Sequence, residues 1–299
     1  MIYVQLGNIG TAMVTPFSLD GMIDYAQTAT LLEHLIANGT DSVVVSGTTG
    51  ESPTLTVTEK KELLDFVVKV VNKRIPVIAG TGSNNTAESI ELTKAAELSG
   101  ADGIMLVTPY YNKPDQKGMY AHFSTIAHVT ALPILLYNIP SRSIVNLLPE
   151  TVIALSKIDN IKAIKEASGN LEQMAEIIEG TADDFEVYSG DDGLTLPLLS
   201  IGGRGIISVS SHVVGNEIQK MIQAFQNGNT KEAADIHRSL LPVFRALFST
   251  PNPVPVKYAL EKIGVATGGV RLPLVEMDAS EAAMIDIALE NFEKRTRIL

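Results

Sequence analysis

The sequence predicts a closed (β/α)8 barrel followed by a small helical domain. Short apolar runs rich in β-branched residues alternate with amphipathic helical stretches eight times, and after residue 228 only the helical pattern continues. The runs are almost continuously apolar, as in parallel strands that are buried on both faces. The expected strands span residues 9–17, 42–46, 76–80, 103–108, 133–137, 161–166, 186–189 and 205–208.

These patterns divide the chain into two expected domains, an α/β TIM barrel over residues 1–228 and a helical domain over residues 229–299. The expected helices of the second domain span residues 231–248, 254–263 and 279–296. A doubly wound open sheet is the alternative architecture. It is disfavoured because no Gly-x-Gly-x-x-Gly motif follows the first expected strand.

Composition excludes several classes of function. The chain has no cysteine, so disulfides, thiolate nucleophiles and cysteine-ligated metal centres are excluded. A net charge of −11 and the lack of a basic stripe argue against a nucleic-acid partner. No apolar run reaches the roughly 18 residues of a membrane span, and the first residues do not resemble a signal peptide. We therefore expect a cytoplasmic enzyme with no membrane partner.

Polar residues follow two of the expected strands at the end where a barrel carries its active site. Residues 47–52 (GTTGES) can form a tight turn whose backbone N–H groups bind an anion, although an ordinary turn has the same composition. Tyr137 can transfer a proton, and Arg142 can bind a carboxylate. Each alone could equally be a packing residue or a solvated charge.

Lys165 is the most informative residue of the sixth strand. Side chains alternate along a strand, so Lys165 shares a face with two small neighbours, Ala163 and Ala167. Lowering the pKa of a buried lysine from about 10.4 to 7–8 requires roughly 4 kcal/mol, which burial can supply, and gives an amine that attacks carbonyls. The residues alone leave a second interpretation open, a structural ion pair with Glu166 or Glu51.

Other chemistries have weaker support in the sequence. The five histidines lack metal-ligand spacing, and the paired acids Asp191 and Asp192 are typical of a solvated turn, so we expect no metal site. The acidic loop after the seventh expected strand also disfavours a phosphorylated substrate. Lys162 has the opposite parity to Lys165 and is expected to be a structural charge.

Motifs at several strand ends together resemble the dihydrodipicolinate synthase family of the N-acetylneuraminate lyase superfamily, which are class I aldolases. The resemblance covers almost the whole chain. It rests on residues 47–52 (GTTGES), 109–114 (PYYNKP), 137–142 (YNIPSR), 164–167 (IKEA) and 252–257 (NPVPVK).

The resemblance implies a reaction and a role for each site residue. Pyruvate, bound as a Schiff base, would condense with L-aspartate-4-semialdehyde, with no cofactor, in the pathway to diaminopimelate and lysine. Lys165 matches the Schiff-base lysine. The other matches are a proton relay (Tyr137, Thr48 and Tyr111, the last reaching a neighbouring subunit), carboxylate-binding residues (Thr49 and Arg142), and backbone carbonyls lining the pocket (Gly190 and Ile207).

The resemblance also implies a homotetramer built as a dimer of dimers, and a regulatory site for lysine. In lysine-inhibited members, histidines occupy the positions that are Val57 and Lys60 here, whereas Asn84, Glu88 and Tyr110 are retained. We therefore expect weak or absent lysine feedback. Two alternative functions remain open: another Schiff-base aldolase, acting on N-acetylneuraminate or 2-keto-3-deoxygluconate, and a non-catalytic binding protein on the same barrel.

Overall fold

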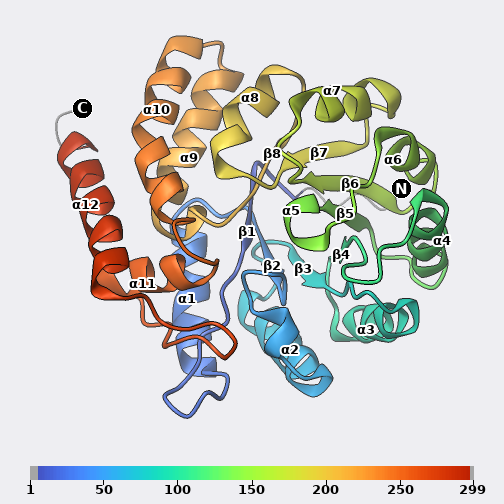
Figure 1. Ribbon diagram of the computed structural model, residues 1–299, viewed down its shortest axis with the longest axis horizontal. Helices are drawn as coiled ribbons and strands as arrows, with labels where there is room; N and C mark the ends of the chain where they lie inside the picture. Colours follow the sequence, from blue (N-terminus) through green and yellow to red (C-terminus); the bar gives the residue numbers. More distant parts are fainter. Residues whose placement is uncertain (1–5, 297–299) are drawn as a thin grey trace.

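A computed structural model describes residues 6–296, and its centre is a closed barrel of eight parallel strands (Figure 1). Each strand pairs with its neighbours in chain order, and β8 closes the barrel against β1. The predicted fold class is confirmed. The strands are β1 (Ile9–Ala12), β2 (Ser42–Val45), β3 (Val77–Gly80), β4 (Gly103–Val107), β5 (Ile134–Asn138), β6 (Ile161–Glu166), β7 (Glu186–Ser189) and β8 (Gly205–Ser208).

The first strand is shorter than predicted, because the ladder ends at Ala12 and not at Phe17. Pro16 has no N–H to donate to a neighbouring strand. The chain leaves the barrel here, and the Phe17 N–H donates to the carbonyl of Thr267, far away in the sequence. The last residues of the predicted strand therefore contact the C-terminal part of the chain.

Helices surround the barrel, and their starts follow local capping chemistry. The Asp24 side chain accepts a hydrogen bond from the Gln27 N–H at the start of α1, and Thr56 and Glu59 form a reciprocal capping box on α2. The helices up to the end of the barrel are α1 (Tyr25–Ala37), α2 (Val57–Val71), α3 (Thr86–Ser99), α4 (Gln116–Ala127), α5 (Pro140–Ser143), α6 (Pro149–Leu155), α7 (Leu171–Gly180), α8 (Thr195–Ser200) and α9 (Ser211–Gln226).

Two layers of apolar side chains make up the core. One fills the barrel and includes Ala163 and Ile207, which point inward from β6 and β8. The other lies between strands and helices and includes Ile164, the neighbour of Ala163 on the opposite face. The strand alternation predicted around Lys165 is therefore confirmed, and it turns Lys165 into the barrel.

Three helices follow the barrel: α10 (Thr230–Ala246), α11 (Val254–Lys262) and α12 (Ala279–Thr296). Helix α10 packs against α9 and α12, and α11 also contacts both, so the three helices lie along one side of the barrel (Figure 1). Between residues 6 and 296, no helix is both long and apolar enough to cross a bilayer.

Closure of the barrel requires glycine at position 205. A Cβ atom there would lie 2.0 Å from the Asn8 carbonyl oxygen, inside the seam between β8 and β1. We expect Gly205→Ala to lower the free energy of unfolding by about 1–3 kcal/mol or more, because the backbone of the seam must shift. Equilibrium unfolding in urea measures this, and an unchanged midpoint would contradict the tight seam.

Candidate active site

Lys165 lies inside the barrel, near the carboxyl end of β6. It is in register with Tyr137 on β5 and Tyr188 on β7, and its side chain is 4% exposed. Its Nζ lies 4.4 Å from the centre of the Tyr137 ring. A primary amine is thus buried beside a phenol at the end of the barrel where this fold carries its catalytic groups.

The carboxylates that could have neutralised Lys165 are bound elsewhere. Glu166 points away from the barrel interior and accepts hydrogen bonds from Asn138 and Gln173. Glu51 forms an ion pair with Lys257. Within the described part of the chain Lys165 has no ion pair, so the alternative of a structural pair with Glu166 or Glu51 is wrong.

Burial lowers the pKa of the Lys165 amine to about 8, against the partly opposing effect of the Asp192 charge, and the Arg142 charge lowers it further. About one amine in ten is then neutral at pH 7, compared with fewer than one in a thousand at the usual pKa. A neutral amine at this position can attack a carbonyl carbon.

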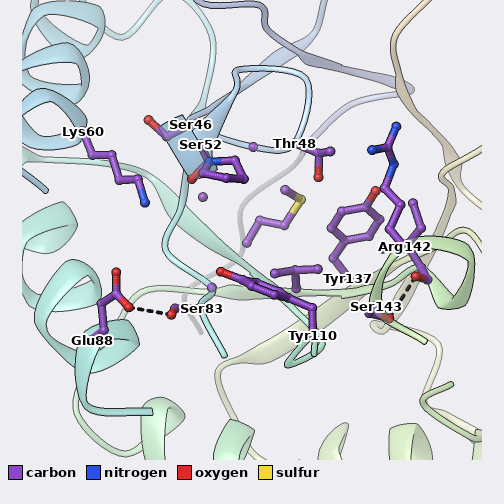
Figure 2. A pocket seen from close by; sticks show the side chains of 17 residues that line it. Ser46, Thr48, Ser52, Lys60, Ser83, Glu88, Tyr110, Tyr137, Arg142 and Ser143 are labelled. Carbon is purple, nitrogen blue, oxygen red and sulfur yellow. Dashed lines mark hydrogen bonds between the residues drawn. The ribbon is translucent and has the colours of Figure 1, made fainter. Parts of the chain in front are cut away.

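Tyr137 lines a cavity of about 230 Å³ at the mouth of the barrel, together with Thr48 and Arg142 (Figure 2). Burial raises the pKa of the Tyr137 phenol to about 12, although the Thr48 hydroxyl and the Arg142 charge counteract this rise. The phenol therefore keeps its proton at neutral pH and can donate it to a compound bound to the Lys165 amine.

Gly190 borders a second cavity, of about 550 Å³, which Arg142 also lines. Lys165 lines neither cavity directly. Its stem lies against Gly190, where a Cβ would be 3.1 Å from Lys165 Cε and 2.6 Å from the Ala167 Cβ. Gly190 is thus required for space, and Lys165 contacts one lining residue of each cavity, Tyr137 and Gly190.

The turn after β2 presents few free backbone donors. The N–H groups of Gly50, Glu51 and Ser52 donate to carbonyls within the turn, whereas those of Thr48 and Thr49 donate to no backbone carbonyl among residues 6–296. An anion bound here would therefore be held by the Thr48 and Thr49 N–H groups, a narrower set than the whole motif predicts.

Two residues to which the sequence analysis gave no role in the site support it. Asn252 donates from Nδ2 to Thr49 Oγ1 at 2.9 Å, and both residues are buried. Asp192, expected to be solvated, is 2% exposed and accepts hydrogen bonds from the hydroxyls of Ser208 and Ser210. Asp192 is buried and not solvated because these serine hydroxyls bind its carboxylate, which its sequence neighbour Asp191 does not reveal.

The remaining predicted residues occupy different places. Ile207 is buried in the barrel interior, in the same apolar cluster as Tyr137. Tyr111, by contrast, is 87% exposed with a positive φ of 74°, and a single chain does not bring it to Lys165. Its neighbour Tyr110 lines the first cavity instead (Figure 2). Lys162 pairs with Asp184 at 2.8 Å, as expected for a structural charge.

A barrel that holds a largely buried, partly neutral lysine beside a protonated tyrosine defines a class of enzyme, the Schiff-base-forming lyases and aldolases. Comparison with known proteins gives the family. The dihydrodipicolinate synthetase family model matches residues 5–291, and the chain belongs to that family.

Its relatives are similar over nearly their whole length. The 4-hydroxy-tetrahydrodipicolinate synthase of Bacillus velezensis is 58% identical over 278 residues, which are 93% of this chain and 96% of the relative. A solved dihydrodipicolinate synthase from Bacillus anthracis has a TM-score of 0.95 at 56% identity, over 96% of this chain and 98% of that one. One from Cyanidioschyzon merolae, with lysine bound, also has a TM-score of 0.95, at 49% identity, over 96% and 98%.

Replacing Gly190 tests whether the amine depends on the space that this glycine leaves. We expect Gly190→Ala to slow the modification of Lys165 by pyruvate about 100-fold, because the added methyl group displaces the lysine stem. Borohydride trapping followed by mass spectrometry measures the rate. Gly193→Ala is the matched control, since its nearest neighbour is 3.3 Å away; equal rates in both variants would contradict the close contact.

Proposed function

We propose that this enzyme condenses pyruvate with L-aspartate-4-semialdehyde to give 4-hydroxy-tetrahydrodipicolinate, with Lys165 as the covalent catalyst. One observation carries the proposal: Lys165 is buried beside Tyr137, has no ion pair with a residue between 6 and 296, and has a pKa lowered to about 8. Membership of the family and the names of its relatives support the same reaction.

In the proposed mechanism, the neutral Lys165 amine attacks the C2 ketone of pyruvate and forms a carbinolamine. Loss of water, with a proton supplied by Tyr137, gives an iminium ion. The Tyr137 phenolate then takes a proton from the pyruvate methyl group and gives an enamine, whose carbon attacks the aldehyde of the second substrate, and the aldehyde oxygen takes the proton back from Tyr137. The amine of the second substrate finally attacks the iminium carbon, which closes the ring and releases Lys165 as the free amine. The iminium nitrogen accepts the electrons in the deprotonation step, so the residues of the site other than Lys165 supply only binding and proton transfer.

Proton transfer through this site needs a path to solvent. We assign it to Tyr137, Thr48 and the partner subunit's Tyr111, in that order. The exposure of Tyr111 in a single chain supports a role across a subunit interface. The same assignment implies that the enzyme works as an oligomer, which we propose is a homotetramer of two dimers in the cytoplasm.

The proposed reaction requires the site to bind two carboxylates, one from each substrate. We assign the pyruvate carboxylate to the side chain and the N–H of Thr49, which is one of the two available backbone donors of the turn. Arg142 lines both cavities and offers a bidentate site for the carboxylate of the semialdehyde. The carbonyls of Gly190 and Ile207 would border the reacting atoms.

The same lysine and tyrosine could serve an aldolase that cleaves N-acetylneuraminate or 2-keto-3-deoxygluconate. Arg142, a cation common to both cavities, favours a short carboxylated second substrate over a polyhydroxylated chain. Comparing condensation with pyruvate release from the sugar acids discriminates between these activities. A non-catalytic protein would give neither reaction.

Trapping the proposed intermediate tests the assignment of Lys165. Pyruvate with borohydride is expected to add one reduced pyruvate per chain, on the peptide that contains Lys165, because only this amine is both buried and unpaired in the site. Intact mass and peptide mapping measure it. Lys165→Met should abolish the adduct and Lys162→Met should retain it; an adduct on another lysine would contradict the assignment.

Removing the Tyr137 hydroxyl tests the proton transfer. We expect Tyr137→Phe to lower kcat by about 10²–10³-fold, in the range typical of a general acid–base group, while the fold is unchanged. Steady-state kinetics and thermal unfolding measure the two effects. A kcat within threefold of the original would assign the proton transfer to another group.

Lysine feedback is expected to be weak or absent. Lys60 lines the first cavity with Glu88 and Tyr110, so a lysine ligand would meet a resident ammonium group there (Figure 2). The side chain of Val57, at the start of α2, has no polar group to bind a ligand. A titration of activity with lysine should show no half-inhibition below the millimolar range. Half-inhibition well below 1 mM, roughly 4 kcal/mol of binding free energy, would refute this expectation.

A further inference from the structure

The C-terminal part of the chain contacts the turn that follows β2 through three polar interactions. Asn252 Nδ2 donates to Thr49 Oγ1 at 2.9 Å, Lys257 Nζ lies 2.8 Å from Glu51 Oε1, and the Arg271 N–H donates to Glu51 Oε2 at 2.9 Å. The first two contacts come from the start of α11 and the residues just before it. The turn that carries Thr48 and Thr49 is thus fixed by residues more than 200 positions away.

The ion pair between Lys257 and Glu51 is almost completely buried, with side chains 3% and 1% exposed. Lys257 Nζ also donates to the Gly269 carbonyl at 2.7 Å and lies 4.2 Å from the centre of the Phe17 ring. Burying two charges costs as much desolvation free energy as their attraction returns, so such a pair contributes mainly to a defined geometry.

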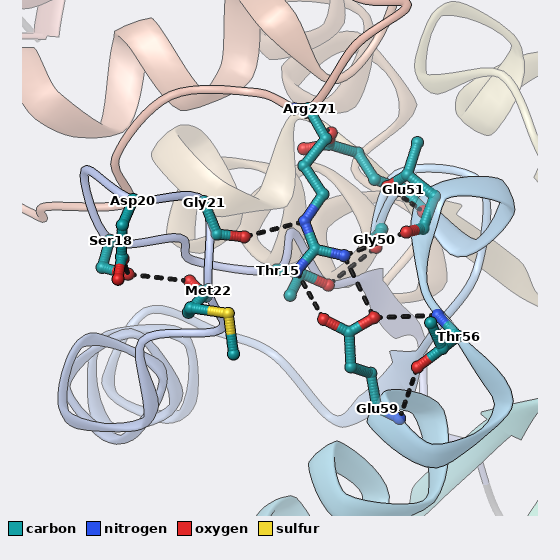
Figure 3. A network of polar contacts seen from close by, with 11 residues as sticks. Thr15, Ser18, Asp20, Gly21, Met22, Gly50, Glu51, Thr56, Glu59 and Arg271 are labelled. Atoms are coloured by element: carbon teal, nitrogen blue, oxygen red, sulfur yellow. Dashed lines mark hydrogen bonds and ion pairs between the residues drawn. The ribbon is translucent and has the colours of Figure 1, made fainter.

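The side chain of Arg271 is held by several partners, and this fixes the position of the backbone N–H that donates to Glu51. Its guanidinium group forms a bidentate pair with Glu59 and donates to the carbonyls of Thr54 and Gly21 (Figure 3). The hydrogen bond from Arg271 lowers the pKa of the Glu59 carboxyl to about 2, so the pair stays charged over the whole neutral range.

Glu51 has a left-handed backbone conformation, with φ of 55°, at the end of the turn. On the other side of the turn, the Thr15 hydroxyl donates to the Gly50 carbonyl at 2.7 Å (Figure 3). The turn is therefore held between the segment that follows β1 and the C-terminal part of the chain. The orientation of its two available donors, the Thr48 and Thr49 N–H groups, depends on both contacts.

We infer that the buried Lys257–Glu51 ion pair, with Asn252 and Arg271, is a positioning device that orients the Thr48–Thr49 turn for the pyruvate carboxylate. The inference rests on the proposed function. None of the four residues is a catalytic residue in the proposed mechanism, because they act through the turn. A change in this pair should therefore alter the affinity for pyruvate. It should leave unchanged the affinity for the second substrate, which we assign to Arg142 on α5.

Two variants of the full-length enzyme separate positioning from stability. Lys257→Met leaves Glu51 buried and unpaired, so it should lower the unfolding temperature as well as pyruvate affinity. Glu51→Gln with Lys257→Met removes both charges, and should restore most of the unfolding temperature. Lys162→Met is the matched control, because it breaks an ion pair with Asp184 near the start of β6, at the other end of the strand from Lys165.

Each variant is assayed below its unfolding transition for three quantities: the pyruvate concentration that half-saturates borohydride trapping, the KM for the semialdehyde, and kcat. We expect half-saturation by pyruvate to rise at least tenfold in both the single and the double variant, with the semialdehyde KM within twofold of the original. The control should change all three quantities less than twofold.

The double variant decides the outcome, even if Lys257→Met fails to fold. A double variant with recovered stability and an unchanged pyruvate half-saturation would overturn the inference, because the pair would then be structural only. An equal rise in the KM of both substrates would overturn it as well. If the unaltered enzyme forms no pyruvate adduct, it is the proposed function that fails.

Discussion

The structure depends on one physical constraint, the cost of holding an ammonium group inside the barrel with no carboxylate of the described residues in direct contact with it. Burial and the positive field of Arg142 lower the pKa of Lys165, and Asp192 offsets only part of that effect. The parity of β6 turns this side chain inward, and Gly190 leaves room for its stem. The nearby carboxylates of Glu51 and Glu166 are bound to other partners, so the amine keeps its reactivity.

The mouth of the barrel is assembled from segments that are distant in the sequence. Strand β1 ends at Ala12, and the Phe17 N–H then donates to the Thr267 carbonyl in the loop after α11. The same loop supplies Arg271 to the turn after β2 (Figure 3). The helices after the barrel are therefore connected to the substrate side of the molecule, which explains how a change there can alter binding without touching a substrate.

Much of this arrangement follows from sequence pattern. Continuous apolar strands, alternating with helices, predict the barrel, and strand alternation predicts the direction of Lys165, because both depend on local periodicity. The predicted end of β1 is wrong because the backbone after Met13 finds partners outside the ladder: the Val14 N–H donates to the His212 ring and the Phe17 N–H to the Thr267 carbonyl. Asp192 was missed because its burial depends on serines of β8 and the loop that follows it.

Polar contacts between residues that are distant in the sequence could not be predicted either, because they too depend on tertiary packing. The contact between Asn252 and Thr49 joins residues 203 positions apart, and no periodicity relates them. Tyr111 is a different case, because its assigned role requires a second subunit and no property of one chain could place it. Local sequence patterns predict the secondary structure and which face of each element is buried. Tertiary packing determines which polar groups meet at the mouth of the barrel.

The central claim is that Lys165 is held partly neutral by its surroundings, and its pKa can be measured directly. Competitive labelling of the lysines with trace acetic anhydride over a range of pH gives the titration of each amine, after peptide mapping. We expect half-maximal reactivity of Lys165 near pH 8. A value near 10.4, that of an unperturbed lysine, would contradict it.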